Sequence, residues 1–285
     1  MASLKIIRKR ISSVKSTEKI TRAMKMVSAA KLRRAQEAAM RARPYAEKLN
    51  VLLRTVASRV EQSHPLLAVP ETERRVDLLL ITSDRGLCGG YNTNLIKKAA
   101  AFRQERKEAQ VRLTLVGRKG YDYFRRRKAD IVEQHVNLFG GPSHELAVRI
   151  GSRFAREFAA GDTDAVYVIY AHFRSALSQV PTTERLLPVM ASEQDAGASA
   201  DYRYEPDSAT LLDRLLLQYV TTVIDHAFLE SIASEHGARM TAMDNATTNA
   251  ADMINSLTLE MNRARQAQIT KELMEIVGGA EALKG

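Results

Sequence analysis

The segment of this chain most typical of an enzyme spans residues 83–92, with the sequence SDRGLCGGYN. It follows a short apolar run suited to a buried strand and precedes a helical pattern. A phosphate-binding loop needs backbone N–H groups exposed by glycines at set spacing, usually followed by Lys and then Ser or Thr. Gly86, Gly89 and Gly90 match neither the dinucleotide fingerprint nor the mononucleotide loop. The spacing therefore favours a tight turn that positions Tyr91 and Asn92 over a nucleotide site.

The other groups that could perform chemistry are scattered along the chain. The six histidines include no pair at metal-ligand spacing, and Cys88 is the only cysteine. No serine lies in a nucleophile-elbow motif. Asp162 and Asp164 flank a predicted turn, where we expect them to be solvated rather than paired for acid–base catalysis. A single cysteine excludes an internal disulfide and fits a reducing compartment. We therefore expect this chain to hold no catalytic residue, cofactor or metal.

The charge of the chain is concentrated at its N-terminus. Net charge is +10 over 285 residues, and residues 1–43 hold thirteen Lys and Arg against Glu18 and Glu37. Such a segment suits nucleic acid, an anionic lipid surface or an acidic protein surface, and composition alone does not choose among them. We define the basic face as nine of these residues: Arg8, Lys9, Arg10, Lys15, Lys19, Arg22, Lys25, Arg33 and Arg34.

Residues 1–60 are predicted to form one long helix. No glycine precedes Gly86 and no proline precedes Pro44, while Leu4, Ile7 and Ile11 begin an apolar stripe at spacings of three and four. Pro44 should bend or break this helix. The stripe resumes after it, so we expect one kinked helix ending near Val60.

A second long helix is predicted over 207–285, with Asp207 or Ser208 as its N-cap. At 1.5 Å per residue it would run on the order of 100 Å, more than a globular domain can bury. Residues spaced by threes and fours form a coiled-coil seam within it: Met240, Met243, Thr247, Ala250, Ile254, Leu257, Met261 and Ala264. Because both seams lie in one chain, an intramolecular antiparallel pair is a simpler arrangement than a helical bundle or an extended homodimer.

The middle of the chain, residues 75–190, has a different character. Apolar runs at 75–82, 111–116 and 165–170 suit buried strands, with a further strand possible at 185–189. Helical patterns at 94–107, 119–127 and 143–160, the last with Ser143 as N-cap, separate them. This alternation predicts a Rossmann-like α/β domain with a mostly parallel sheet, and thus a mixed α/β fold overall. Residues 191–206 are polar and are expected to form a mobile loop.

Three segments resemble one known family. Residues 7–36, residues 238–283 and the central SDRGLCGGYN are similar to the gamma subunits of rotary ATP synthases. The resemblance implies a non-catalytic central shaft, present in one copy, that contacts three alpha and three beta subunits, the epsilon subunit and the c-ring. It would transmit torque between proton flow and ATP synthesis or hydrolysis, and would regulate the ATPase. ATP or ADP and Mg would be bound by the alpha and beta subunits.

The resemblance also implies roles for particular residues. Five positions match places where the family's shaft meets the beta subunits: Met24, Arg265, Gln266, Thr270 and Glu272. Ile276 and Val277 would lie in the apolar bearing at the tip of the shaft. The basic face would meet acidic loops of beta, and Met24 is expected close to Arg265.

The resemblance further implies a bacterial enzyme on the cytoplasmic face of the inner membrane, bound there through the complex and without the cysteine pair of photosynthetic relatives. Two other functions stay open from the residues themselves. The basic helix could belong to a coiled-coil protein that binds nucleic acid, which the resemblance does not imply. The central domain could belong to an enzyme that uses a nucleotide.

Overall fold

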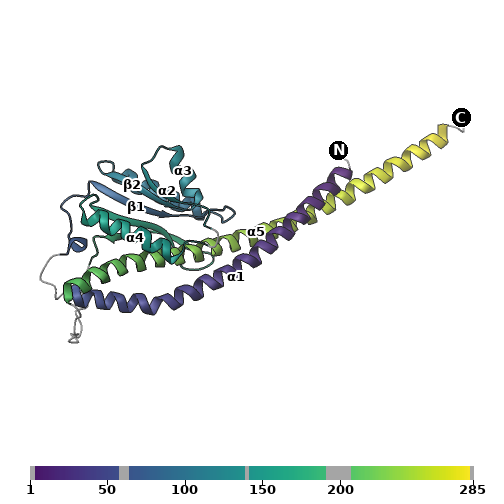
Figure 1. Cartoon of the computed structure of the whole chain (residues 1–285). Helices are drawn as coiled ribbons and strands as arrows, with labels where there is room; N and C mark the ends of the chain where they lie inside the picture. Colours follow the sequence, from purple (N-terminus) through teal and green to yellow (C-terminus); the bar gives the residue numbers. More distant parts are fainter. Residues whose placement is uncertain (1–3, 58–63, 139–140, 191–206, 283–285) are drawn as a thin grey trace. The chain divides into compact units, whose positions relative to one another are not determined.

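The computed structural model of the chain describes residues 4–57, 64–138, 141–190 and 207–282 (Figure 1). They form two compact units, one comprising residues 28–239 and the other residues 1–27 with 240–285. The helices α1 (Leu4–Ala57) and α5 (Ser208–Ala282) each continue from one unit into the other. Pro44 lies inside α1, which continues beyond it as a helix. The expected end of this helix near Val60 and the loop at 191–206 lie outside the described residues.

The unit of residues 28–239 contains a five-stranded sheet in the order β3-β2-β1-β4-β5. Four strands are parallel, namely β1 (Arg75–Ile81), β2 (Gln110–Val116), β3 (Ile131–His135) and β4 (Ala165–Phe173). The last strand, β5 (Gln179–Leu187), runs antiparallel to β4. The predicted mostly parallel sheet is therefore confirmed.

Two strands differ from the sequence prediction. β3 was not predicted, because this short edge strand alternates between half-buried and exposed residues up to the buried His135 and lacks an apolar run. β5 begins at Gln179 rather than at 185, since most of it is only partly buried and carries Thr182, Thr183 and Glu184. Apolar runs identify strands that are covered on both faces, and these two are not.

Three shorter helices connect the strands: α2 (Tyr91–Glu105), α3 (Arg118–Arg126) and α4 (His144–Ala159). All three were predicted within a few residues. Ser143 caps α4, as expected, by accepting a hydrogen bond of 3.3 Å from the Leu146 N–H. Asp207 acts similarly before α5 and accepts a bond of 2.8 Å from the Thr210 N–H.

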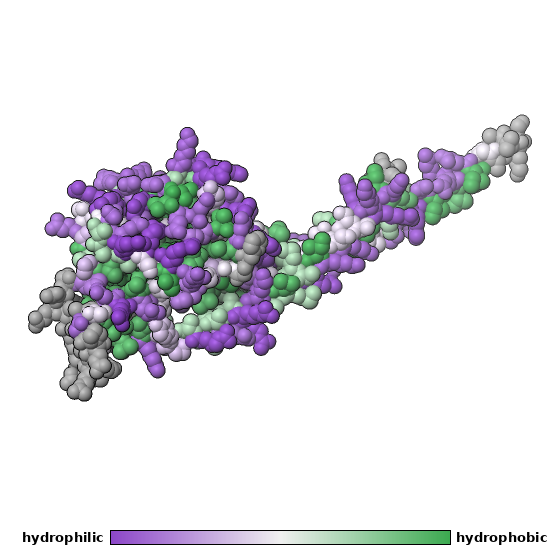
Figure 2. Space-filling view, viewed as in Figure 1, coloured by the Kyte–Doolittle hydropathy of each residue, from purple (hydrophilic) through white to green (hydrophobic). Residues whose placement is uncertain are grey.

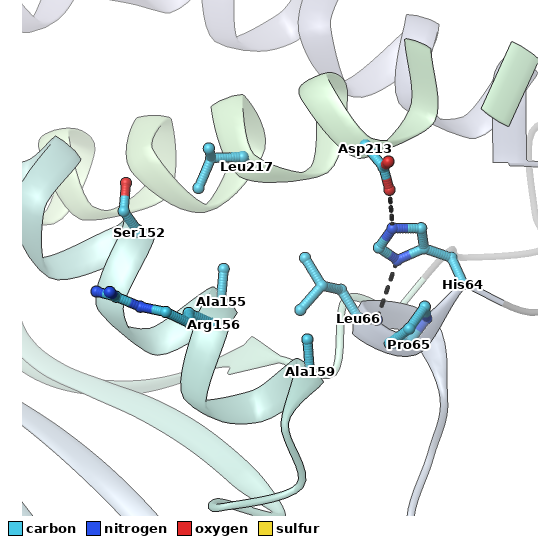
Figure 3. A pocket seen from close by; sticks show the side chains of 9 residues that line it. All are labelled: His64, Pro65, Leu66, Ser152, Ala155, Arg156, Ala159, Asp213 and Leu217. Carbon is cyan, nitrogen blue, oxygen red and sulfur yellow. Dashed lines mark hydrogen bonds and ion pairs between the residues drawn. The ribbon is translucent and has the colours of Figure 1, made fainter. Parts of the chain in front are cut away.

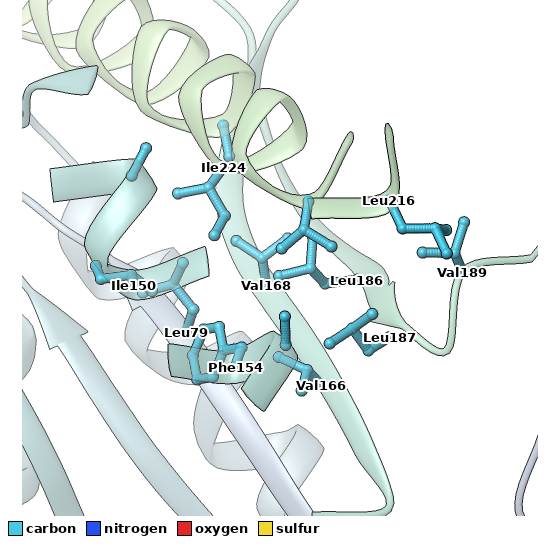
Figure 4. Packing of buried hydrophobic residues seen from close by; sticks show 14 of the residues in the cluster. Leu79, Ile150, Phe154, Val166, Val168, Leu186, Leu187, Val189, Leu216 and Ile224 are labelled. Carbon is cyan, nitrogen blue, oxygen red and sulfur yellow. The ribbon is translucent and has the colours of Figure 1, made fainter. Parts of the chain in front are cut away.

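The strand β1 separates two apolar clusters because its side chains alternate between the faces of the sheet. On one face Leu79 packs with Phe154 of α4 and with Ile224 of α5 (Figure 4), and Phe228 of α5 belongs to the same cluster. On the other face Leu78 and Leu80 pack with residues of α2 and α3. The first part of α5 is thus a structural layer of this unit.

In the other unit, α1 and α5 pair antiparallel. The hydroxyls of Thr21 and Thr247 are 2.7 Å apart, and Lys25 Nζ lies 2.6 Å from Asp244 Oδ1, so rising numbers on α1 meet falling numbers on α5. Every predicted seam residue from Met240 to Ala264 is buried or half-buried. The predicted antiparallel coiled coil is confirmed, and its seam ends where α1 begins.

Candidate functional site

The 83–92 segment is held by its own hydrogen bonds. The Asn92 side chain accepts from the Ser83 N–H at 3.0 Å and donates to Ser83 Oγ at 2.8 Å. The Ser83 hydroxyl also donates to the Arg85 carbonyl at 2.6 Å. Leu87 and Gly89 have positive φ of 62° and 56°, so the chain turns sharply here. These bonds use the polar side chains at both ends of the segment and make it a structural turn.

Asp84 has a similar structural role. Its carboxylate accepts from the N–H groups of Arg118, Asn137 and Leu138 at 2.8–3.0 Å. The carboxylate therefore connects the 83–92 segment to the start of α3 at Arg118 and to Asn137 and Leu138, which follow β3. A carboxylate so engaged is not available as a catalytic base.

The other side of this segment lies against α5, at residues that the sequence did not single out. Arg239 donates to the Gly86 carbonyl at 3.2 Å and pairs with Glu235 at 2.7 Å. The Tyr91 hydroxyl donates to the Ser231 carbonyl at 3.2 Å. No short motif could have indicated the contacts of Tyr91 with Ser231 and of Arg239 with Gly86, because they join residues 140 and 153 positions apart.

Burial shifts the pKa values of the groups around Arg239. It raises the pKa of Glu235, which Arg239 and Lys31 partly counteract. It lowers the pKa of His236 to about 4, and the charges of Arg239 and Lys31 act in the same direction. Burial also raises the pKa of Cys88, which favours the protonated thiol over the thiolate.

A shallow cavity of about 370 Å³ lies between α4, α5 and the short 3-10 helix Pro65–Leu67 (Figure 3). His64 Nε2 lies 2.5 Å from Asp213 Oδ1, and His64 Nδ1 accepts from the Leu66 N–H at 3.0 Å. Both ring nitrogens are thus engaged within the chain. His64 joins the segment before β1 to α5 and has no nitrogen left for a ligand.

The described residues contain no group of three or more His, Cys, Asp and Glu side chains that could hold a metal ion. Among the same residues, no helix is long and apolar enough to cross a membrane.

The basic face is largely exposed along α1. Of its nine residues only Lys25 is half-buried, and it pairs with Asp244. Arg22 pairs with Glu18 at 2.5 Å and Arg33 with Glu37 at 3.0 Å, one helical turn apart in each case. Exposed pairs of this kind contribute little to stability, about 0.3–0.5 kcal/mol each. The positive charge is therefore available to a partner.

The residues assigned to the shaft by resemblance lie on different parts of the helix pair. Met24 is half-buried, whereas Arg265, Gln266, Thr270 and Glu272 are exposed. The expected proximity of Met24 to Arg265 is wrong. The pairing of Thr21 with Thr247 and of Lys25 with Asp244 places Met24 beside that stretch of α5, about 30 Å of helix from Arg265.

The C-terminal part of α5 is exposed on all sides from Arg265 to Gly279. Ile276 and Val277 expose 69% and 55% of their surface. The same stretch carries further exposed apolar side chains, namely Ile269, Leu273 and Met274. Figure 2 shows green, hydrophobic surface along this part of the helix. Exposed apolar side chains gathered on one helix mark a surface for a partner.

Comparison with known proteins identifies the family. The family described as ATP synthase matches residues 3–283. The chain is 49% identical to the ATP synthase gamma chain of Anaeromyxobacter sp. (strain Fw109-5) and 50% identical to that of Pelotomaculum thermopropionicum, each covering all of both chains.

Solved structures are similar in fold. A chain from the central stalk and c-ring of Tetrahymena thermophila mitochondrial ATP synthase is 26% identical, with a TM-score of 0.61 over 80% of this chain and 99% of that chain. A chain from Euglena gracilis mitochondrial ATP synthase, 20% identical, has a TM-score of 0.71 over 98% of this chain and 94% of that chain. Because the family model and these relatives match over the length of the chain, this chain belongs to the ATP synthase gamma chain family.

Proposed function

We propose that this chain is the rotor shaft of an ATP synthase and carries torque between a membrane c-ring and a hexamer of three alpha and three beta subunits. It holds no nucleotide itself, and ATP or ADP with Mg is bound by the alpha and beta subunits. The chain is present once per complex, also contacts the epsilon subunit, and lies on the cytoplasmic face of a bacterial inner membrane. It thereby couples proton flow to ATP synthesis or hydrolysis.

The observation that carries the proposal is the part of α5 that extends beyond its pairing with α1. Residues from Arg265 onward have no partner helix among the described residues, yet they include large apolar side chains. A solvent-exposed helix of this kind needs a surrounding protein surface to bury Ile276 and Val277. A collar of alpha and beta subunits around the tip is such a surface.

The paired part of the helices supports the same function. An antiparallel pair resists twisting better than one helix, because the seam must shear before either helix can rotate. Its seam residues are small or flexible, as with Thr21 beside Thr247 and Ala250, which allows close approach of the two helices.

The exposed charge on α1 supports a partner with acidic loops. Arg8, Lys9 and Arg10 are exposed, and long-range attraction to acidic beta loops would guide the shaft without fixing it at one angle. In the same way Arg265 and Gln266 offer exposed donors to a beta-subunit loop, while Glu272 already accepts a bond of 2.9 Å from Gln268.

Assembly tests the proposal. The chain is co-expressed with alpha and beta subunits, separated by size-exclusion chromatography, and the ATPase activity of the co-eluting material is measured. We expect one copy of the chain per three alpha and three beta, with ATP hydrolysis that the isolated chain lacks. A chain that elutes apart from the hexamer, or that hydrolyses ATP alone, contradicts the proposal.

A pair of variants tests the role of the tip. Ile276→Asp places a carboxylate in the apolar bearing, whereas Val69→Asp places one at a site of similar exposure in the other unit. We expect Ile276→Asp to lower retention of the chain by the hexamer at least threefold and Val69→Asp to leave it unchanged. Equal retention of both variants would argue against the bearing.

A further inference from the structure

Arg239 occupies a special place on α5, because it is the last residue of the unit 28–239 before the helix continues into the other unit. Its side chain is buried, with the residue 8% exposed. The guanidinium donates from Nη2 to the Gly86 carbonyl at 3.2 Å and from Nε to the same oxygen at 3.4 Å. Nη1 lies 2.7 Å from Glu235 Oε1, one turn back on the same helix.

The neighbouring turns of α5 are attached to the same edge of the sheet. The Ser234 hydroxyl donates to the Ala171 carbonyl at 2.9 Å, and the Glu230 carboxylate accepts from the Phe173 N–H at 2.7 Å. A Cβ added at Gly237 would lie 3.0 Å from the Phe173 ring and 3.3 Å from the Ala176 Cα, so α5 approaches this part of the chain closely. All these contacts fall at the C-terminal ends of β1 and β4 or just beyond them.

The chemistry of this contact suits a mechanical joint. Interdigitated apolar side chains resist sliding of a helix, but apolar attraction is non-directional and holds no particular pair of atoms together. Charged hydrogen bonds to fixed carbonyls are directional and are strengthened by burial. Arginine supplies several donors in a rigid fork and can bind Glu235 and the Gly86 carbonyl at once, which a lysine cannot match.

We propose that Arg239 is a positioning residue that latches α5 to the turn at residues 83–92 and so transfers torque between the α/β unit and the shaft helices. The role rests on the rotor function proposed above. The turn at residues 83–92 is then the binding surface for α5: its bend at Leu87 and Gly89 presents the Gly86 carbonyl to the guanidinium.

Coupling measurements in the assembled ATP synthase test the latch. Inverted membrane vesicles carrying wild type, Arg239→Gln, Arg239→Lys or the control Arg214→Gln are assayed for ATP hydrolysis and for ATP-driven proton pumping. Arg214 is exposed on the same helix. We expect Arg239→Gln to keep hydrolysis within twofold but to pump at least threefold less per ATP, with Arg239→Lys intermediate and Arg214→Gln like wild type.

Cys88 provides a local readout of the same joint. It belongs to the turn at residues 83–92, is 2% exposed and is the only cysteine of the chain. Alkylation of Cys88 in the assembled complex is followed by mass spectrometry of this chain. We expect Arg239→Gln to speed alkylation at least fivefold, since the turn loses its contact with α5, and Arg214→Gln to leave it unchanged.

Several results would overturn the proposed role of Arg239. Unchanged pumping per ATP in Arg239→Gln would do so, as would equal losses of hydrolysis and pumping, which indicate a purely structural role. If Arg239→Gln does not assemble, Glu235→Gln is measured instead, and unchanged pumping together with unchanged Cys88 alkylation overturns the proposal. Failure of the wild-type complex to pump would refute the rotor function itself and is thereby distinguished from failure of the latch.

Discussion

Replacing His236 by Gln should remove most of one pH-dependent contribution to stability. Burial, with the charges of Arg239 and Lys31, lowers the pKa of His236 in the folded chain to about 4. Gln at this position keeps an acceptor for Arg239, whose Nη1 lies 3.4 Å from His236 Nδ1, and does not titrate. The variant therefore isolates the proton equilibrium from the packing.

The sign and size of this change in the free energy of unfolding follow from the linkage between proton binding and folding. The unfolded chain, with an ordinary histidine pKa of about 6.5, binds the proton before the folded chain does, so the free energy of unfolding falls as pH drops from about 7 toward 4. The full difference of about 2.5 pKa units corresponds to at most about 3.4 kcal/mol. Between pH 7.5 and pH 5.5 the expected loss is about 1.4 kcal/mol.

Urea unfolding of wild type and His236→Gln at pH 7.5 and pH 5.5 measures this loss. Other titrating groups, including Glu235 with its raised pKa, are common to both proteins and cancel in the difference. We expect the stability of wild type relative to the variant to fall by about 1.4 kcal/mol between the two pH values. A relative change smaller than about 0.5 kcal/mol, the usual scatter of mild substitutions, would refute the reasoning.

Three further substitutions test other parts of the structure. Gly117→Ala should destabilise the chain by at least about 3 kcal/mol, because φ is +93° and the new Cβ would lie 2.1 Å from the Thr82 carbonyl oxygen; an unchanged urea midpoint would contradict this. Asp77→Ala should lower the free energy of unfolding by about 3–5 kcal/mol, because the fully buried carboxylate pairs with Arg112 at 2.5 Å, and a loss below about 1 kcal/mol would show that the pair is dispensable. Met24→Lys should impair ATP-driven proton pumping with hydrolysis largely kept, because it adds charge beside the basic face, and equal losses of both activities would count against this.

Much of the fold follows from local patterns in the sequence. The strands β1, β2 and β4 are apolar runs because both of their faces are covered, and the seam of α5 was predicted residue by residue because coiled-coil spacing is regular. The edge strand β3 and the polar start of β5 lack such patterns. Their place in the sheet depends on neighbours distant in sequence.

The candidate sites were predictable to different degrees. The exposed tip with Ile276 and Val277 was placed by resemblance to a family, and the structure shows their exposure. The contact of Arg239 with Gly86 was not predictable, because an arginine in a helix is usually a solvated residue. Only the fold brings it beneath a turn 153 residues away.

Rotation driven by ATP tests the central claim most directly. A bead is attached through a biotinylated cysteine introduced at Leu177, an exposed position in the turn between β4 and β5, and the alpha and beta subunits are fixed to a surface. We expect the bead to rotate in one direction when ATP is added and to stop when ATP is removed. A complex that hydrolyses ATP while this chain stays still would contradict the account.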